Sequence, residues 1–430
     1  MNKLIALIAV LGFAGSAHAA DGADFSHSGD FRLQYVNNMN ADMSDASTSD
    51  DTDQNWKQRL RWGTDVRAGE KLTGHFTLVH NANWGENAGT AQYPNVTTGT
   101  ENILFVNEAY ATWMLSDAWM MRFGRGSFTM ADGRFVSSND YQPVQKAFDG
   151  ALATWDQEMA RISFFAVQGA NFTEANAQGN FFGASADFKT LPDFMKTANL
   201  HVVQVKQDET ADLGGLPQED NMRAGFSVTG DVVGLDWRVN YEIESGSLTL
   251  AGADSDISTS MMDAELGYTM AEMMNSRLHV GYHMDSGNSA STTAGDREQY
   301  NGFHYDTHNN GGFMDIYSWG NLTYMNVGFS MNPTDDINVA VDYYMFTQTE
   351  KDGVNSSRIA SLDSATTPAN GDATKDDLGT ELDVTVTKKY TNNFNISGSY
   401  RMFTPGDEWK ANMGLEDTYS QLYFVSKLTF

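Results

Sequence analysis

The sequence of 430 residues has no cysteine and is short of positive charge. Without cysteine, neither disulfide bonds nor thiolate chemistry can contribute to the fold or the function. Lysine and arginine number 27 against 56 aspartates and glutamates, for a formal net charge of −29. Nucleic acid is therefore not expected as a partner, because phosphate binding needs a basic face. Aromatic residues make up 12% of the chain, which argues against a disordered protein.

Long apolar runs are also missing, apart from one at the N-terminus. Lys3 precedes an apolar stretch over residues 4–13, and small residues then lead to Ala17-His18-Ala19. This order is typical of a secretory signal peptide with an A-x-A cleavage site, and the stretch is shorter than the about 20 residues of a membrane-spanning helix. We expect residues 1–19 to be a signal peptide and residues 20–430 to form a single domain.

The rest of the chain shows a regular alternation of apolar and polar residues. Between residues 235 and 244 the apolar set is Leu235, Trp237, Val239, Tyr241 and Ile243, and the polar set is Asp236, Arg238, Asn240, Glu242 and Glu244. Successive side chains of a strand point to opposite sides, so the pattern predicts a strand with one apolar and one charged face. Such strands form membrane β-barrels, with the apolar face toward lipid and the polar face toward the lumen.

Eighteen segments of the chain can be interpreted in this way. They are 26–37, 55–67, 72–83, 103–115, 119–128, 148–156, 160–168, 179–189, 198–206, 221–231, 234–244, 260–270, 276–285, 319–332, 337–347, 379–388, 394–403 and 419–430. An even number is the rule for single-chain bacterial barrels.

The connections between these segments alternate in length. Short ones lie at 68–71, 116–118, 157–159, 190–197, 231–234, 271–275, 332–336 and 389–393, and long ones include 38–54, 84–102, 129–147, 207–220, 245–259, 286–318 and 348–378. The predicted fold is all-β: a transmembrane antiparallel up-and-down barrel of about 18 strands with short periplasmic turns and long extracellular loops. In this topology 286–318 and 348–378 lie outside the cell.

The prolines are consistent with this strand map. All seven, Pro94, Pro143, Pro192, Pro217, Pro333, Pro368 and Pro405, fall in the predicted connections. Proline cannot donate to a strand ladder, so a barrel without edges should exclude it from strand interiors.

The last predicted strand ends in an aromatic residue. Leu422, Phe424, Leu428 and Phe430 alternate with Tyr423, Val425, Lys427 and Thr429. Phe424, Leu428 and Phe430 thereby resemble the signal that the outer-membrane assembly machinery recognises. The alternative is the terminal strand of a soluble sandwich.

Several short motifs resemble the alginate-export-like porins of the bacterial outer membrane. Around the fifth predicted strand they are Asn107-Glu108-Ala109-Tyr110, Gly124-Arg125, Gly133-Arg134 and Phe148-Asp149-Gly150. Two more lie near the C-terminus, at residues 378–383 and 403–407. The resemblance implies a monomeric 18-stranded barrel with an arginine-rich, anion-conducting lumen, although Gly126 stands where that family often has glutamine. Trimeric general porins are the next resemblance, so a monomer and a homotrimer both stay open.

Charged residues on the polar strand faces are the candidates for the lumen. A charge that faces lipid at the bilayer midplane costs about 2–4 kcal/mol, so Lys57, Arg59 and Arg61, at alternate positions of one strand, must face water or acids. The full candidate set is Lys57, Arg59, Arg61, Glu108, Arg122, Arg125, Arg134, Asp149, Arg238, Glu381 and Arg401.

These cations allow two interpretations, and both can hold. They form a basic ladder that steers and binds anionic or hydroxyl-rich solutes, or they are structural and pair with lumen acids such as Glu108, Asp149, Glu242, Asp263, Glu265 and Glu381. We also expect loop 129–147 to fold into the barrel and narrow it. Its Phe135, Val136 and Tyr141, with Phe128 just before it, would pack on the wall while Arg134 and Lys146 face the water path.

Catalytic, metal and cofactor sites are not predicted. No Gly-x-Ser-x-Gly turn occurs. His279 and His283 share a strand face but lie about 13 Å apart at a rise of about 3.3 Å per residue, too far for one ion. The acidic loop with Asp42, Asp45, Asp50, Asp51 and Asp53 lacks the EF-hand order, so a solvated loop is favoured over a calcium site.

The sequence therefore predicts a passive channel in the outer membrane of a Gram-negative bacterium. Its solutes would be small and polar, with anionic and carbohydrate-like solutes as the candidates. The expected partners are these solutes, outer-membrane lipid and lipopolysaccharide, and the assembly machinery. The alternatives are an outer-membrane barrel enzyme of lipase or protease type and a structural or adhesive barrel.

Overall fold

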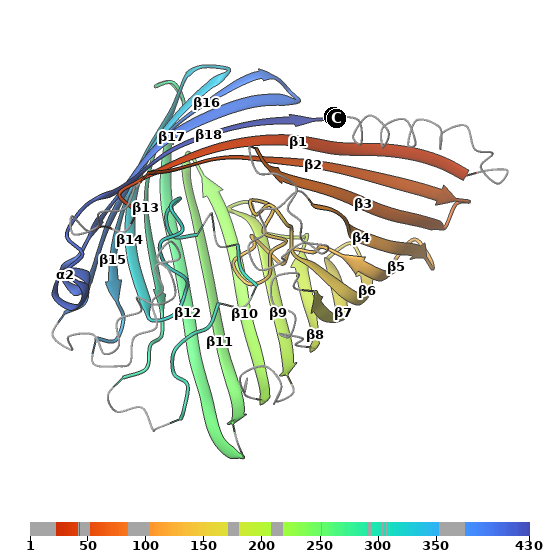
Figure 1. The fold of residues 1–430 in the computed structure, drawn as a ribbon. Helices are drawn as coiled ribbons and strands as arrows, with labels where there is room; N and C mark the ends of the chain where they lie inside the picture. The colour runs from red at the N-terminus through yellow and green to blue at the C-terminus, as the bar shows by residue number, and fades with distance from the viewer. Residues whose placement is uncertain are drawn as a thin grey trace.

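The computed structural model describes residues 23–41, 43, 52–84, 103–170, 180–207, 218–250, 252–289, 295–351 and 375–430, apart from 303, 307 and 309. Within these residues 18 strands form one antiparallel sheet, in which β1 pairs with both β2 and β18. The sheet therefore closes on itself as a barrel, and Figure 1 shows β1 and β18 side by side. The predicted fold class is confirmed.

The strands follow each other around the barrel in chain order. They are β1 (Ala23–Met39), β2 (Thr52–Ala68), β3 (Leu72–Asn83), β4 (Ile103–Met114), β5 (Trp119–Gly126), β6 (Ala147–Asp156), β7 (Ala160–Ala170), β8 (Asn180–Phe188), β9 (Met195–Gln207), β10 (Gln218–Val232), β11 (Leu235–Leu250), β12 (Ala253–Met270), β13 (Ser276–Asp285), β14 (Leu322–Thr334), β15 (Ile337–Gln348), β16 (Asp377–Thr391), β17 (Phe394–Pro405) and β18 (Tyr419–Thr429). Helix α2 (Asp407–Met413) lies between the last two strands. Among the described residues, no helix is long and apolar enough to cross a membrane.

The two faces of the strands differ as the alternation predicts. On β11, Tyr241 and Ile243 are exposed on the outer face, whereas Asn240 and Glu242 are buried on the inner face. Apolar side chains on the outside cost little in lipid, while polar groups on the inside find partners across the lumen. The same alternation along the other strands gives the barrel an apolar outer surface.

Two prolines do not lie where the sequence places them. Pro333 is part of β14, and Pro405 is the last residue of β17. The register of β14 shifts between Met331 and Thr334, so Pro333 sits in an irregularity where a ladder donor is not required. The same reasoning covers Pro405, because a terminal strand residue can do without a donated bond.

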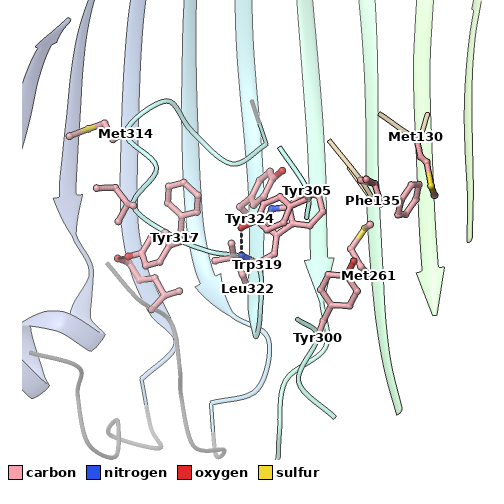
Figure 2. Close-up of a cluster of buried hydrophobic side chains, with 14 of the residues drawn as sticks. Met130, Phe135, Met261, Tyr300, Tyr305, Met314, Tyr317, Trp319, Leu322 and Tyr324 are labelled. Atoms are coloured by element: carbon pink, nitrogen blue, oxygen red, sulfur yellow. Dashed lines mark hydrogen bonds between the residues drawn. The ribbon is translucent and has the colours of Figure 1, made fainter. Parts of the chain in front are cut away.

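The interior of the barrel is partly filled by two connections. Loop 129–147, between β5 and β6, folds inward as predicted, and Phe135 and Val136 are buried there. Connection 286–321, between β13 and β14, does the same in its described part, and Tyr300, Ile316 and Trp319 are among its buried residues. Figure 2 shows side chains of both segments in one apolar cluster with residues of the wall.

Connection 286–318 joins its strands at the same end of the barrel as loop 129–147, and its described residues turn into the lumen instead of extending away from the rim. Its large apolar side chains would be costly in water, and they gain more by packing in the lumen. The predicted strand 319–332 begins only at Leu322 for the same reason. Asp285 accepts hydrogen bonds from the backbone N–H of Gly320 (2.9 Å) and Leu322 (2.7 Å), which fixes the turn into β14.

Candidate functional site

The wall formed by β1 and β2 anchors loop 129–147 through arginines. Arg32 donates to the carbonyls of Asp140 (3.0 Å) and Tyr141 (2.6 Å), and Arg59 donates to those of Asp140 (2.7 Å) and Gln142 (3.2 Å). Both guanidinium groups are almost fully buried. Arg59 from the predicted basic ladder thus holds the loop, and Arg32, which sequence reasoning missed, shares this role.

Two carboxylates lie among these cations. Asp30 contacts Arg59 at 3.1 Å and Arg61 at 2.6 Å, and Asp140 of the loop contacts the same two arginines at 3.2 and 2.7 Å. Burial alone would raise the pKa of Asp140, but the positive charges of Arg59 and Arg61 outweigh it and lower that pKa. Asp140 is therefore an ionised anchor at neutral pH.

The signal for Arg32 was present in the sequence. Asp30, Arg32 and Gln34 occupy alternate positions of β1 and face the lumen together. The rule that identified Lys57, Arg59 and Arg61 applies equally here. Arg223 was missed in the same way on β10.

The opposite wall, formed by β11 and β12, holds the loop through acids. Arg134 contacts Asp132 and Asp263, each at 2.8 Å, and Arg238 contacts Asp263 (3.3 Å) and Glu265 (3.1 Å). Burial disfavours the charged form of Arg134, but Asp263 and Asp132 more than compensate, so its pKa is raised. Arg134 and Arg238, each predicted to line the lumen, are thus brought together by a shared carboxylate.

A second acidic cluster holds connection 286–321. Arg223 contacts Glu242 (3.2 Å) and Glu244 (2.9 Å), and the Tyr300 hydroxyl donates to Glu242 at 2.9 Å. Arg297 contacts Glu244 at 2.7 Å. Each buried charge is thus matched by others, as burial requires.

Glu381 and Arg401 contact the same connection on the β16–β17 wall. The backbone N–H of Met314 donates to Glu381 at 2.9 Å, and that of Phe313 donates to the neighbouring Asp383 at 3.2 Å. Arg401 donates to the Phe313 carbonyl at 2.5 Å. These residues bind a turn of the backbone.

The two inward segments also bind each other. Backbone N–H groups of Ser137 and Asp306 donate to the carbonyls of His304 and Gly133, both at 2.9 Å. Burial lowers the pKa of His304 to about 3, so its ring is neutral. The two segments therefore behave as one unit across the lumen.

Of the remaining candidates, Lys57 lies on β2 opposite the buried Asn83 of β3, and the other four separate into two groups. Glu108 and Arg122 lie inside, where Glu108 accepts from the Ser127 hydroxyl (2.6 Å) and Arg122 donates to the Ser127 carbonyl (3.1 Å). Arg125 and Asp149 instead pair with each other at 2.7 Å.

The position of this Arg125–Asp149 pair departs from expectation. Arg125 lies an even number of positions from the exposed Trp119 and Phe123 of β5, and therefore on the same outer face. Asp149 is related in the same way to the exposed Trp155 of β6. Because Arg122 and Arg125 are three positions apart, they cannot share a face of one strand. The structure therefore separates Arg125 and Asp149 from the lumen residues.

One hydrogen-bonded chain resembles part of a hydrolase triad. His75 contacts Asp65 at 2.7 Å and the Thr77 hydroxyl at 2.8 Å. Thr77 is buried, however, and its hydroxyl donates to Glu108 at 3.1 Å. A nucleophile needs a free path to its substrate, and this buried hydroxyl has none.

Metal sites find no support in the described part of the chain, where no cluster of three or more ligating side chains occurs. His279 instead pairs with Asp342 at 3.1 Å, and His283 lies between Asp263 (3.5 Å) and Asp285 (3.2 Å). Most of the acidic loop around Asp45 lies outside the described residues.

The chain matches one protein family and is similar in fold to several solved barrels. A family model described as alginate export matches residues 24–422. No curated protein sequence matches the chain. The chain is similar to the crystal structures of Pseudomonas aeruginosa OccK8 (OprE), with a TM-score of 0.60 and 12% identity over 95% of this chain and 98% of the other, and of OccK9 (OpdG), with 0.62 and 11% over 95% and 99%. The structure of P. aeruginosa OpdK with vanillate gives 0.62 and 10% over 95% and 98%. At this level of identity the likeness shows the fold.

Proposed function

The chain belongs to the alginate export family, and from this premise we propose that its lumen passes small anionic solutes along the wall formed by β1 and β2. A barrel of this family and strand number is a channel of the Gram-negative outer membrane. The identity of the solute has to come from the charges that line the lumen.

The observation that carries the proposal is a cluster of positive charge at the middle of one wall, around loop 129–147. Five cations surround two carboxylates there: Arg32, Lys57, Arg59, Arg61 and Lys427 around Asp30 and Asp140. Asp24, Asp53, Asp65 and Arg67 occupy the same alternate positions but lie nearer the ends of β1 and β2. On the wall from β10 to β13 the balance is reversed: Arg134, Arg223, Arg238, Arg277 and Arg297 meet Asp132, Glu219, Asp236, Glu242, Glu244, Asp263 and Glu265. An anion in the lumen is therefore drawn to the β1–β2 side.

Exposure divides the cations of this wall by role. The Arg59 side chain is 3% exposed and is enclosed by its contacts with the loop. Arg61 and Lys427 also contact Asp140 of the loop, but they are 23% and 35% exposed and so remain accessible from the lumen. Arg61, Lys427 and the neighbouring Lys57 are therefore the groups that meet a solute. Arg32 and Arg59 position the loop that narrows the path.

The comparisons support an anionic solute. One barrel of similar fold was crystallised with vanillate, which is a small carboxylate. A carboxylate can take two hydrogen bonds from one guanidinium, which suits an arginine-lined path.

Export and assembly belong to the same proposal. Residues 1–19 direct export, residues 20–430 form the barrel, and Phe424, Leu428 and Phe430 are recognised by the assembly machinery. In support, the exposed Leu428 and Phe430 lie at the seam where β18 meets β1. The apolar outer surface meets lipid and lipopolysaccharide.

Charge selectivity in a planar bilayer tests the function. Under a KCl gradient the wild-type protein should show a reversal potential that favours chloride. The K57Q/R61Q/K427Q variant should shift that potential toward potassium, because three exposed lumen cations are lost.

The control variant K351Q/K375Q/K388Q removes the same charge from Lys351, Lys375 and Lys388, which are exposed and away from this wall. Salt screens such charges within about 8–10 Å, so it should behave as wild type. Equal reversal potentials for wild type and the lumen variant would contradict the proposed path.

A further inference from the structure

Two adjoining cavities lie between loop 129–147 and the short turns. Their volumes are about 520 and 500 Å³, and both are lined by Ala131, Arg161 and Asp187. The lining runs from the loop to the turn residue Ala118 and to Lys189 beyond β8. Each volume falls in the range of about 300–1,000 Å³ that is typical of small-molecule sites.

A continuous band of hydroxyl and amide groups lines these cavities. Thr154 of β6 and Ser163 of β7 are opposite each other, with hydroxyl oxygens 3.4 Å apart, and Ser185 of β8 is opposite Ser163. The Asn199 amide of β9 donates to Ser185 at 2.8 Å, and Ser227 of β10 is opposite Asn199. The strand register therefore brings five uncharged polar side chains into one row, which we call the hydroxyl belt.

A second pair continues the belt toward the short turns. The hydroxyl oxygens of Thr197 and Thr229, on β9 and β10, lie 2.7 Å apart. Each hydroxyl can both donate and accept, so the belt can adapt to a ligand that presents several hydroxyls.

The charged residues at the rim are nearly balanced. Arg161 and Lys189 both contact Asp156, and Lys196 contacts Asp231 at 3.2 Å. The lining as a whole contains Arg161, Lys189 and Lys196 against Asp117, Asp132, Asp156 and Asp187. Unlike the β1–β2 wall, this region has no excess of cations that would select an anion.

Apolar surface adjoins the belt in the first cavity, where Leu152 and Phe165 lie two positions from Thr154 and Ser163 on the same strand faces. Phe128 at the start of the inward loop packs on Phe165 of β7, with ring centroids 5.5 Å apart, and Leu152 lies beside them. The cavity thus combines a flat apolar side with a row of hydroxyls.

We propose that the joined cavities bind an uncharged polyhydroxylated solute, such as a sugar, at a subsite separate from the cationic wall. A sugar ring has apolar C–H faces and a rim of hydroxyls, and it matches both sides of the cavity without needing a net charge. The inference rests on the proposed function to the extent that the solute must reach the lumen.

Block of the single-channel current measures this binding. The probes are maltose, which is uncharged, and glucuronate, which is a sugar of similar chemistry with one negative charge. The full-length protein is extracted from outer membranes, and its KCl conductance is recorded before either probe is added. Maltose should reduce the wild-type current in a saturable manner.

The variant T154V/S163A/S185A removes three hydroxyls of the belt with little change of shape. Its maltose binding should be at least about tenfold weaker, because a lost hydrogen bond contributes about 0.5–1.5 kcal/mol and a factor of ten is about 1.4 kcal/mol. Its KCl conductance and its reversal potential should stay as in wild type. S185A alone should weaken binding about threefold and covers the case in which the triple variant does not fold.

The matched control is T385V/S397A/S399A on β16 and β17. These hydroxyls form similar cross-strand pairs, Thr385 with Ser399 (3.0 Å) and Thr387 with Ser397 (2.7 Å), outside both cavities. Maltose block should be unchanged there.

The outcomes separate the inference from the proposed function. A conducting wild-type channel that maltose does not block, or belt variants that bind maltose as wild type does, would overturn the subsite and leave the channel intact. Stronger binding of glucuronate, lost in the same belt variants, would overturn the assignment to uncharged solutes. A protein without KCl conductance would refute the proposed function itself.

Discussion

The strongest prediction concerns Arg59, which is the most heavily bonded cation of the β1–β2 wall. Its guanidinium donates to the carbonyls of Asp140 and Gln142 and contacts the carboxylates of Asp30 and Asp140. Arg59→Gln removes the charge and most of these hydrogen bonds. We expect loop 129–147 to leave its position against this wall far more often, while the barrel itself stays folded.

The size of the effect follows from the hydrogen bonds between Arg59 and the loop. Arg59 donates two hydrogen bonds to loop carbonyls, and a hydrogen bond from a charged group contributes about 1.5–3 kcal/mol. Arg32 still donates to the Asp140 carbonyl in the variant, so we take the lower value for each bond, about 3 kcal/mol in all. A loss of about 3 kcal/mol raises the open population on the order of 100-fold.

Hydrogen–deuterium exchange of loop amides measures that population. The N–H of Gln142 donates to Asn139 (3.1 Å) and that of Lys146 to Ser138 (2.7 Å), so both report on the loop. They should exchange about 100-fold faster in Arg59→Gln, with an intermediate change in Arg59→Lys, and amides of β11 should not change. Unaltered protection in Arg59→Gln would refute the anchoring role.

Three further predictions address pH, topology and assembly. The pKa of Asp140 is lowered in the folded protein, so its contribution to holding the loop is complete above the pKa of an unfolded aspartate. This contribution is lost as the pH falls through the lower pKa of the folded state, so the loop amides should exchange faster only in acid. D140N should abolish that pH dependence. Protease added to intact cells should spare the inward segment 295–321 and the turn at 69–71. Cleavage at 69–71 would show that this turn lies outside the cell and would refute the proposed orientation. Deletion of Phe430 should leave the chain in the periplasm, whereas the Phe430→Tyr variant should reach the outer membrane. A normal outer-membrane yield of the deletion variant would show that Phe430 is not part of the assembly signal.

The strand map was accessible from sequence because a barrel strand has a strict period of two. Each position such as Tyr241 or Glu242 faces either lipid or the lumen, and a shift of one residue would reverse every side chain. The polar connections supplied many of the boundaries, but not those of β11 and β12, which extend to Leu250 and from Ala253 through most of the predicted connection 245–259. Pro333 was wrongly assigned to a connection, because a β-bulge tolerates a proline that a regular strand ladder does not.

The contacts in the lumen could be predicted from the sequence only in part, because alternation shows which face a side chain is on but not which residue it contacts. It assigned Arg59 and Arg238 to the interior correctly, but it could not show that one binds carbonyls of a distant loop and the other shares Asp263 with Arg134. Arg125 was assigned to the lumen together with Arg122, although the two are three positions apart, and strict alternation would have put Arg125 on the outer face with Phe123. The large apolar residues of 286–318 were the available signal that this connection folds inward.

Under the proposed function, the two inward segments give the wide barrel its selectivity. An 18-stranded barrel alone would enclose a broad aqueous channel, in which salt would screen the wall charges from a passing solute. The joined segments narrow this space, so a solute must pass close to one wall or another. Along β1 and β2 it meets exposed cations such as Arg61, and along β6 to β10 it meets uncharged hydroxyls such as Ser185. Because Arg59 of β2 and Asp263 of β12 hold the same loop from opposite walls, loss of either anchor should change both routes at once.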